Sequence, residues 1–233
     1  MNVHLALAAS AAVISFAFAL SALERWVDRR KPHEAAWAAS LFLFTAAALS
    51  LLAGVAMGWN ALSFRCFYLF GAIVNVPYLG LGTVWLLGGA KWGRPATAAV
   101  HAFALFAAGV ITVAPLTATI PTDRLPQGSE VFGPLPRVLA AVGSAVPATV
   151  IVAGAIWSAA RLAKRRSTRR LAVANGLIAA GTVVLGAGGV LNSVMNEMDG
   201  FAVSLVAGIV LLFSGFLLTN QTRRPALRAV SAA

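Results

Sequence analysis

Polar and small residues recur on one face of the apolar stretch 64–87, which is long enough to cross a bilayer as a helix. They are spaced by three or four positions, as one helix face requires: Tyr68, Gly71, Asn75, Tyr78 and Gly82. Asn75 lies near the middle of the stretch, and Pro77 frees the carbonyl of Ile73 from its helical hydrogen bond. Freed backbone at that depth is tolerated where a helix lines a cavity, so we expect a kinked helix beside a binding cavity.

We predict that the ligand-binding residues of such a cavity are Asn75, Tyr78, Thr182 and Ser204, all near the middle of apolar stretches. A second interpretation is that these polar and small residues form packing seams. Membrane helices associate through small residues that let their backbones approach, and an interhelical hydrogen bond from Asn75 would add only about 0.6 to 2 kcal/mol.

A second group of polar residues is predicted at the outer ends of the helices. Its proposed core is an outer rim of Arg65, Glu197 and Asp199, which would form an entrance or a partner-binding surface. The loop charges Asp123, Arg124 and Glu130 belong to the same side. The alternative is a set of solvated charges with an Arg65–Glu197 ion pair, and exposed pairs of that kind contribute about 0 to 1 kcal/mol.

Several chemistries are disfavoured because no charged residue lies in the middle of an apolar stretch. Proton pumps and carriers of charged substrates normally keep ionisable groups there. A retinal protein is excluded, since Lys31, Lys91 and Lys164 all lie between apolar stretches. The three histidines are far apart in sequence, and no catalytic, nucleotide-binding or metal-binding motif is present. We therefore expect no catalytic residues, no metal and no cofactor.

The composition is that of an integral membrane protein. Hydrophobic residues make up 60% of 233 residues, and the mean hydropathy is +0.84. The net charge of +11 comes from short loops between apolar stretches, which is the pattern of the positive-inside rule and argues against nucleic-acid binding. Cys66 is the only cysteine, so an intramolecular disulfide is excluded.

The hydropathy pattern predicts an all-α protein with seven transmembrane helices in one domain, residues 1–222, followed by a short basic tail, 223–233. A proline-rich connection that holds no spanning element is expected at 116–136. Each predicted span is close to the ~20 residues that the hydrocarbon core requires. The spans are 3–23, 36–57, 64–87, 96–114, 137–160, 171–194 and 200–219.

The loop charges predict the orientation of the helices. Lysine and arginine concentrate in alternate loops and in the tail, which places the N-terminus outside and the C-terminus in the cytoplasm. The most basic loop, which contains Lys164, Arg165, Arg166, Arg169 and Arg170, could bind the anionic headgroups of membrane lipids. A role as a topology determinant explains the same residues equally well.

A weak internal repeat relates residues 50–65 to residues 182–197. In this alignment Gly54 matches Gly186, and Asn60 matches Asn192. It indicates a 3+1+3 arrangement of two parallel halves joined by the fourth span, a pattern that some transporters use. Chance matches of Gly, Ala and Leu are the alternative in a chain of this composition.

Three segments carry a family resemblance: RCFYLFGAIVNVPYLGLGTVWLL, LPQGSEVFGPLPRVLA and the long run from RRLAVANGLIAAG to LLFSGFLL. They resemble uncharacterised multi-pass membrane proteins of high-GC actinobacteria, over most of the chain after the second span. The resemblance implies a bacterial cytoplasmic (inner) membrane location. It implies no activity and no site residues.

These observations leave three hypotheses. The first is a non-enzymatic membrane protein whose bundle binds or passes a small neutral or lipid-like molecule. The second is an accessory subunit that binds a partner membrane protein. The third is a membrane-embedded enzyme that acts on a lipid or isoprenoid, for which only Glu24, Glu34, Glu197 and Asp199 could supply an acid or base.

Overall fold

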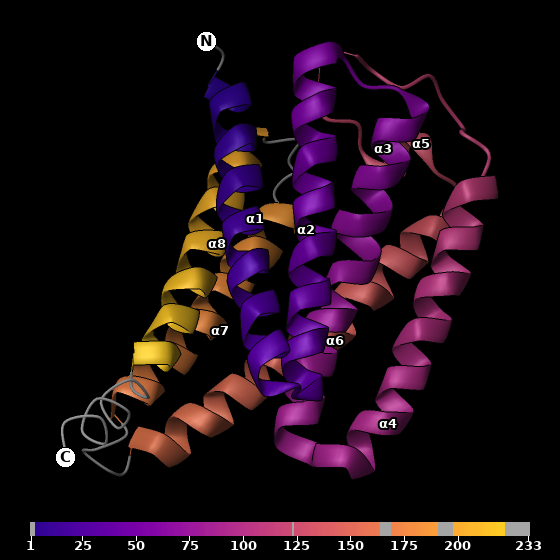
Figure 1. Cartoon of the computed structure of the whole chain (residues 1–233). Helices are drawn as coiled ribbons and strands as arrows, with labels where there is room; N and C mark the ends of the chain where they lie inside the picture. The colour runs from indigo at the N-terminus through magenta and orange to yellow at the C-terminus, as the bar shows by residue number, and fades with distance from the viewer. Residues whose placement is uncertain (1–2, 123, 164–168, 191–197, 222–233) are drawn as a thin grey trace, which may run out of the picture.

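The computed structural model describes residues 3–122, 124–163, 169–190 and 198–221, and these form a bundle of helices (Figure 1). Its long helices are α1 (Val3–Arg29), α2 (Pro32–Met57), α4 (Asn75–Val113), α6 (Pro134–Ala163), α7 (Arg169–Val190) and α8 (Met198–Gln221). Shorter elements are α3 (Ala61–Phe67), the π-helix η1 (Tyr68–Val74) and α5 (Gly128–Val131). The described residues contain no strand beyond an isolated bridge between Leu116 and Phe132.

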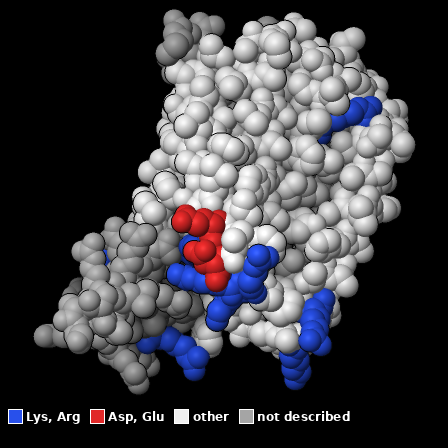
Figure 2. Space-filling model, in the orientation of Figure 1, with Lys and Arg blue, Asp and Glu red and all other residues white. Residues whose placement is uncertain are grey.

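Among the described residues, four helices are long and apolar enough to cross a membrane: Leu5–Arg29, Pro32–Met57, Ala61–Val113 and Pro134–Arg161. Two shorter apolar helices, Ala172–Gly188 and Ala202–Leu218, follow them. The described part of the chain is therefore helical, with helices of the length and composition expected of a membrane protein. In the space-filling view, uncharged residues cover most of the visible face, and lysine and arginine gather toward the end where α1 meets α2 (Figure 2).

The long helix α4 consists of two limbs. Gly89 has φ 60° and ψ −157°, a conformation that interrupts the helix and that residues with a side chain rarely adopt. Figure 1 shows that the chain reverses at this turn, so that the second limb runs back beside the first. A single glycine therefore replaces the loop that the sequence predicted between 87 and 96.

Local signals explain where the first helices begin and end. Pro32 occupies the first turn of α2, where its fixed φ suits a helix start and its missing N–H costs nothing. Gly58, with φ 84°, follows the last residue of α2. Asn60 then caps α3, because its Oδ1 accepts from the backbone N–H groups of Leu62 and Ser63 at 3.0 Å each. The sequence predicted this helix to begin at 64, and the cap places its start at Ala61.

Neighbouring helices pack around a ring: α1 against α2, α2 against the first limb of α4, that limb against α6, α6 against α7, α7 against α8, and α8 against α1. Alanines on α1, including Ala11 and Ala19, are buried in the seam with α2 and α8. The backbones of α7 and α8 approach each other at Gly181 and Gly208. A Cβ added at Gly181 would lie 2.8 Å from the carbonyl oxygen of Gly208. The ring surrounds the candidate site.

Candidate functional site

A cavity of about 1030 Å³ runs through the ring of helices. Its lining comes from α1, α2, η1, the first limb of α4, α6, α7 and α8, and from the residues around α5. Along the continuous helical segment formed by the end of α3, η1 and the first limb of α4, the lining extends from Phe67 to Leu87. Twenty residues of helix span about 30 Å, which matches the hydrocarbon thickness of a bilayer. The second limb of α4 contributes no residue to the lining.

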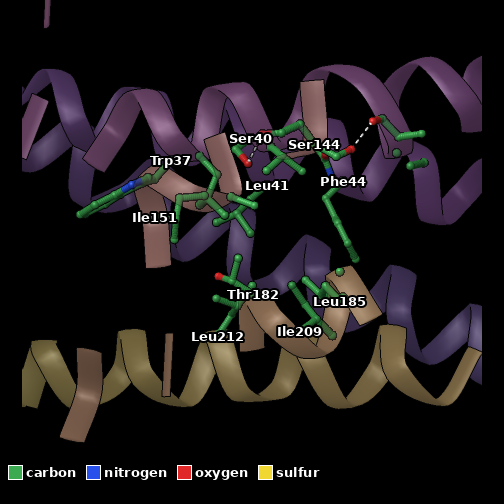
Figure 3. A pocket seen from close by; sticks show the side chains of 18 of the residues that line it. Trp37, Ser40, Leu41, Phe44, Ser144, Ile151, Thr182, Leu185, Ile209 and Leu212 are labelled. Atoms are coloured by element: carbon green, nitrogen blue, oxygen red, sulfur yellow. Dashed lines mark hydrogen bonds between the residues drawn. The ribbon is translucent and has the colours of Figure 1, made fainter. Parts of the chain in front are cut away.

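The middle of the cavity is mostly apolar. Figure 3 shows side chains of α2, α6, α7 and α8 facing one another across it. Leu41 and Phe44 lie on one side, and Leu185, Ile209 and Leu212 lie on the other. Such an interior favours an apolar ligand or the apolar part of a larger one.

The π-helix η1 positions Asn75 on the cavity wall. This segment ends at Val74, and Pro77, which cannot donate a backbone hydrogen bond, follows three residues later. Single π-helical turns absorb this kind of disruption within a helix. The freed carbonyl of Ile73 lies against the backbone of Gly143, where an added Cβ would come within 2.5 Å of the oxygen. The sequence-based expectation of irregular backbone at Pro77 thus corresponds to a π-helical turn.

Two serines from neighbouring helices satisfy carbonyls of this irregular segment. Ser40 of α2 donates its hydroxyl to the Asn75 carbonyl at 2.8 Å, and Ser144 of α6 donates to the Ala72 carbonyl at 2.8 Å. Both serines also line the cavity, as Figure 3 shows. Their hydroxyl protons are therefore already engaged. Sequence reasoning did not single out Ser40, because a lone serine in an apolar helix follows no pattern.

Asn75 itself carries an unsatisfied polar atom. The residue is 7% exposed, it lines the cavity, and its side-chain Oδ1 has no hydrogen-bond partner among the described residues. An unsatisfied buried acceptor costs about 1 to 3 kcal/mol, and the bundle tolerates this cost at Asn75, beside the cavity.

The four predicted ligand-binding residues are divided between the cavity and its surroundings. Asn75 and Thr182 line the cavity, although the Thr182 hydroxyl donates within its own helix to the Ile178 carbonyl at 2.9 Å. Tyr78 and Ser204 are outside the lining. The Tyr78 ring packs edge-on against His101 of the second α4 limb, with 5.4 Å between ring centroids.

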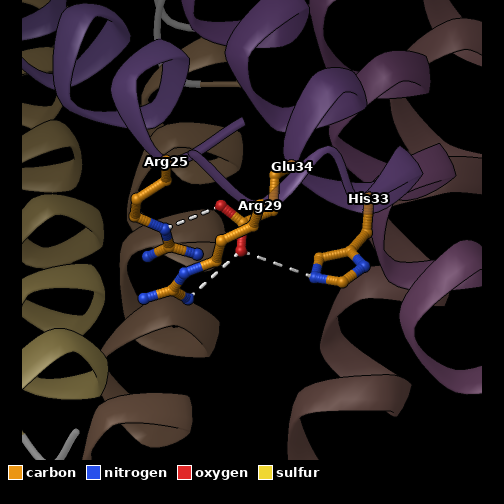
Figure 4. Close-up of polar contacts among 4 residues, drawn as sticks. All are labelled: Arg25, Arg29, His33 and Glu34. Carbon is orange, nitrogen blue, oxygen red and sulfur yellow. Dashed lines mark hydrogen bonds and ion pairs between the residues drawn. The ribbon is translucent and has the colours of Figure 1, made fainter. Parts of the chain in front are cut away.

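Charged side chains occupy one end of the cavity, around a buried carboxylate (Figure 4). Glu34 is only 3% exposed and lies in the first turn of α2. Its Oε2 is 2.9 Å from Arg25 Nε, and its Oε1 is 3.3 Å from Arg29 Nη1. His33 Nε2 lies 3.8 Å from the same Oε1. These contacts join the end of α1 to the start of α2.

Sequence reasoning named Glu34 only as an acid or base for an enzyme and did not predict its ion pairs. One signal was available, because Arg25 and Arg29 are four residues apart and therefore share a helix face. The Arg25 guanidinium also lies 4.1 Å from the ring centroid of Phe216 on α8. Arg25 thus joins three helices at this end of the bundle.

An aromatic cluster and α5 lie at the opposite end of the cavity. Tyr68 lines the cavity there, and its ring centroid is 5.1 Å from that of Phe132. Gly128 of α5 lies so close to the Tyr68 ring that an added side chain would overlap it. Among the described residues that line this end of the cavity, the charged one is Arg137, which is exposed.

Arg65, predicted as part of the outer rim, caps the second limb of α4. Its guanidinium donates to the carbonyls of Ile111, Thr112 and Ala114, the last at 2.7 Å. These carbonyls end a helix and have no partner within it. Glu197 lies outside the described residues, as does the side chain of Asp199, so the rim remains a prediction.

No group of histidine, cysteine, aspartate or glutamate side chains in the described ranges could hold a metal ion. In comparisons with known proteins, no family model matches the chain, and no curated protein or solved structure matches it either.

Proposed function

We propose that this protein is a membrane protein that binds or passes a small neutral or lipid-like molecule within its helix bundle. The observation that carries the proposal is the cavity of about 1030 Å³, whose length matches the hydrocarbon core. A bundle that served only for packing would fill this space with side chains, because protein interiors are close-packed.

The proposed topology has seven spans, with the N-terminus outside and the C-terminus in the cytoplasm of a bacterial inner membrane. The two limbs of α4 joined at Gly89 support counting this helix twice, and the shorter apolar helices α7 and α8 supply the last two spans. The second limb of α4 stays out of the cavity lining, which supports a 3+1+3 arrangement in which the fourth span joins two halves.

An enzymatic role receives less support from the same site. Glu34 is the carboxylate that lines the described part of the cavity, and two arginines already bind it. A general acid or base must be able to exchange its proton with a substrate, whereas this carboxylate is held between guanidinium groups.

The test is to fill the cavity and measure what the protein carries. Gly186 lines the cavity, and an added Cβ there meets no atom within 4 Å, so Gly186→Phe would project its ring into the space. Gly176 of the same helix is equally open but is not part of the lining, which makes Gly176→Phe the matched control. Native mass spectrometry would follow gentle extraction of each protein from its membrane.

We expect a bound small molecule in the wild type and in Gly176→Phe, and its loss in Gly186→Phe. An equal bound mass in all three proteins would place the molecule outside the cavity and contradict the proposal. Empty particles in every preparation would also count against it. A stoichiometric protein partner that survives Gly186→Phe would instead support an accessory subunit.

A further inference from the structure

We propose that the cavity takes an anionic amphiphile, whose carboxylate or phosphate head lies beside Arg29 and Lys31 and whose apolar chain extends between α2, α6 and α8. This inference rests on the proposed function, because it names the class of molecule that the same cavity would hold.

Charge is distributed unevenly along the described lining of the cavity. At one end the described lining holds Arg25, Arg29 and Lys31 together with the single carboxylate of Glu34, which leaves a formal charge of +2 there. Between this end and Arg137 at the other, the described lining residues carry no charge. The cavity therefore offers one strongly basic end and a long uncharged interior, which is the complement of an anionic head and an apolar chain.

The middle of the cavity offers few polar groups to a ligand, since the unsatisfied Asn75 Oδ1 is itself buried. The hydroxyl protons of Ser40, Ser144 and Thr182 are donated to backbone carbonyls. A sugar or another molecule with polar groups on all sides would lose its hydrogen bonds to water without replacing them here. An acyl or isoprenoid chain loses nothing of this kind, because it makes no hydrogen bonds.

The basic end of the cavity is also accessible from outside the bundle. The Arg29 side chain is 33% exposed and reaches Glu34 through a 3.3 Å contact, longer than the 2.9 Å contact of Arg25. Lys31 is exposed and directly precedes α2, so the positive end of that helix dipole lies beside it. Arg29 and Lys31 are thus the basic groups that can meet an incoming head.

Trp37 marks the boundary between the basic end and the apolar interior. It lies one turn into α2 after His33, whose ring centroid is 5.2 Å from that of Trp37. The indole packs against Gly82 of α4 so closely that a side chain at Gly82 would overlap it. Indole groups favour the depth between headgroups and chains, so Trp37 is where the head of an amphiphile would give way to its chain.

The experiment measures binding of four probes to delipidated protein by native mass spectrometry at fixed ionic strength. Oleate and oleoyl lysophosphatidylglycerol share one chain and differ in their anionic heads, and monoolein carries the same chain on a neutral head. Inorganic phosphate is an anion without a chain. We expect both anionic amphiphiles to bind more tightly than monoolein, and we expect no measurable binding of phosphate alone.

The basic end is tested by Arg29→Gln/Lys31→Gln. The double change should weaken binding of the anionic amphiphiles about 25-fold, roughly fivefold for each basic side chain near a membrane surface, and leave monoolein unchanged. The single change Lys31→Gln keeps every ion pair of Glu34 and should cost about fivefold. Lys91→Gln/Arg94→Gln is the matched control, because these exposed basic residues lie at the α4 turn and are not part of the cavity lining.

Each outcome has a distinct meaning. If Gly186→Phe abolishes binding but monoolein binds as tightly as oleate, the cavity binds ligand and the anionic class is wrong. If the Lys91 and Arg94 control weakens binding as much as the Arg29 and Lys31 variant, the preference belongs to the membrane surface and the inference fails. If Gly186→Phe leaves the binding of every probe unchanged, both the proposed function and this inference fail.

Discussion

The ion pairs of Glu34 allow a direct test of what stabilises the basic end of this bundle. Replacing Glu34 by Gln keeps the size of the side chain and removes its charge, so Arg25 and Arg29 are left facing each other beside a neutral amide. Removal of one partner from a buried ion pair costs about 3 to 5 kcal/mol. Glu34 is 3% exposed, but the side chains of Arg25 and Arg29 are 14% and 33% exposed and can regain some water.

We therefore expect Glu34→Gln to lower the free energy of unfolding by about 3 kcal/mol, the lower end of the range for a buried pair. The assay is unfolding by sodium dodecyl sulfate in mixed micelles, followed by the fluorescence of the six tryptophans. The matched control is Glu130→Gln, which breaks the exposed 3.0 Å pair with Arg124. That pair has side chains 41% and 37% exposed, and its loss should cost at most about 1 kcal/mol.

A combined variant separates lost charge from lost packing. Arg25→Met/Glu34→Leu replaces the closer ion pair with apolar side chains and leaves Arg29, which is 33% exposed, to water. Replacements of a buried pair by apolar side chains are often neutral or stabilising. The combined variant should recover part of the stability that Glu34→Gln loses. Equal losses in Glu34→Gln and Glu130→Gln would refute the reasoning, since burial would then have no effect. A combined variant that is less stable than Glu34→Gln would refute it as well.

Two further contacts can be tested in the same assay. Ser144→Ala removes the hydroxyl that donates to the Ala72 carbonyl and should lower the free energy of unfolding by about 0.6 kcal/mol, the average for interhelical hydrogen bonds in membranes. The control is Thr149→Val, which breaks a hydrogen bond within α6 only. An equal loss of stability in the two variants would contradict a role of Ser144 between helices. Arg65→Met removes the donors that cap the second α4 limb and should cost about 2 kcal/mol. Arg65→Lys should restore only part of this loss, because an ammonium cannot span three carbonyls, and full recovery would show that charge alone matters.

Hydropathy predicted the helical parts of the chain but not their ends. The predicted span 137–160 lies within α6, and 3–23 lies within α1. The structure extends α1 to Arg29, since Arg25 and Arg29 continue the helix to reach Glu34. Hydropathy ends a helix at its first charges, whereas long basic side chains can continue it at the membrane surface.

The site was partly predictable for a similar reason. Asn75 and Thr182 stood out as polar residues on small-residue faces, and both line the cavity. Ser40 did not stand out, because its role depends on a carbonyl of another helix. Pro77 indicated irregular backbone, but a proline does not say whether a helix bends or takes up an additional residue.

The π-helix η1 also sets the angle, around the helix axis, at which the side chains of the first α4 limb project. Successive residues of an α-helix are about 100° apart around its axis, so the number of residues before Asn75 decides which way its amide points. Deleting one residue between Tyr68 and Val74 would turn Asn75 and the rest of the first α4 limb by about that angle. The wide turn therefore acts as an angular spacer that aligns the Asn75 side chain with the cavity wall.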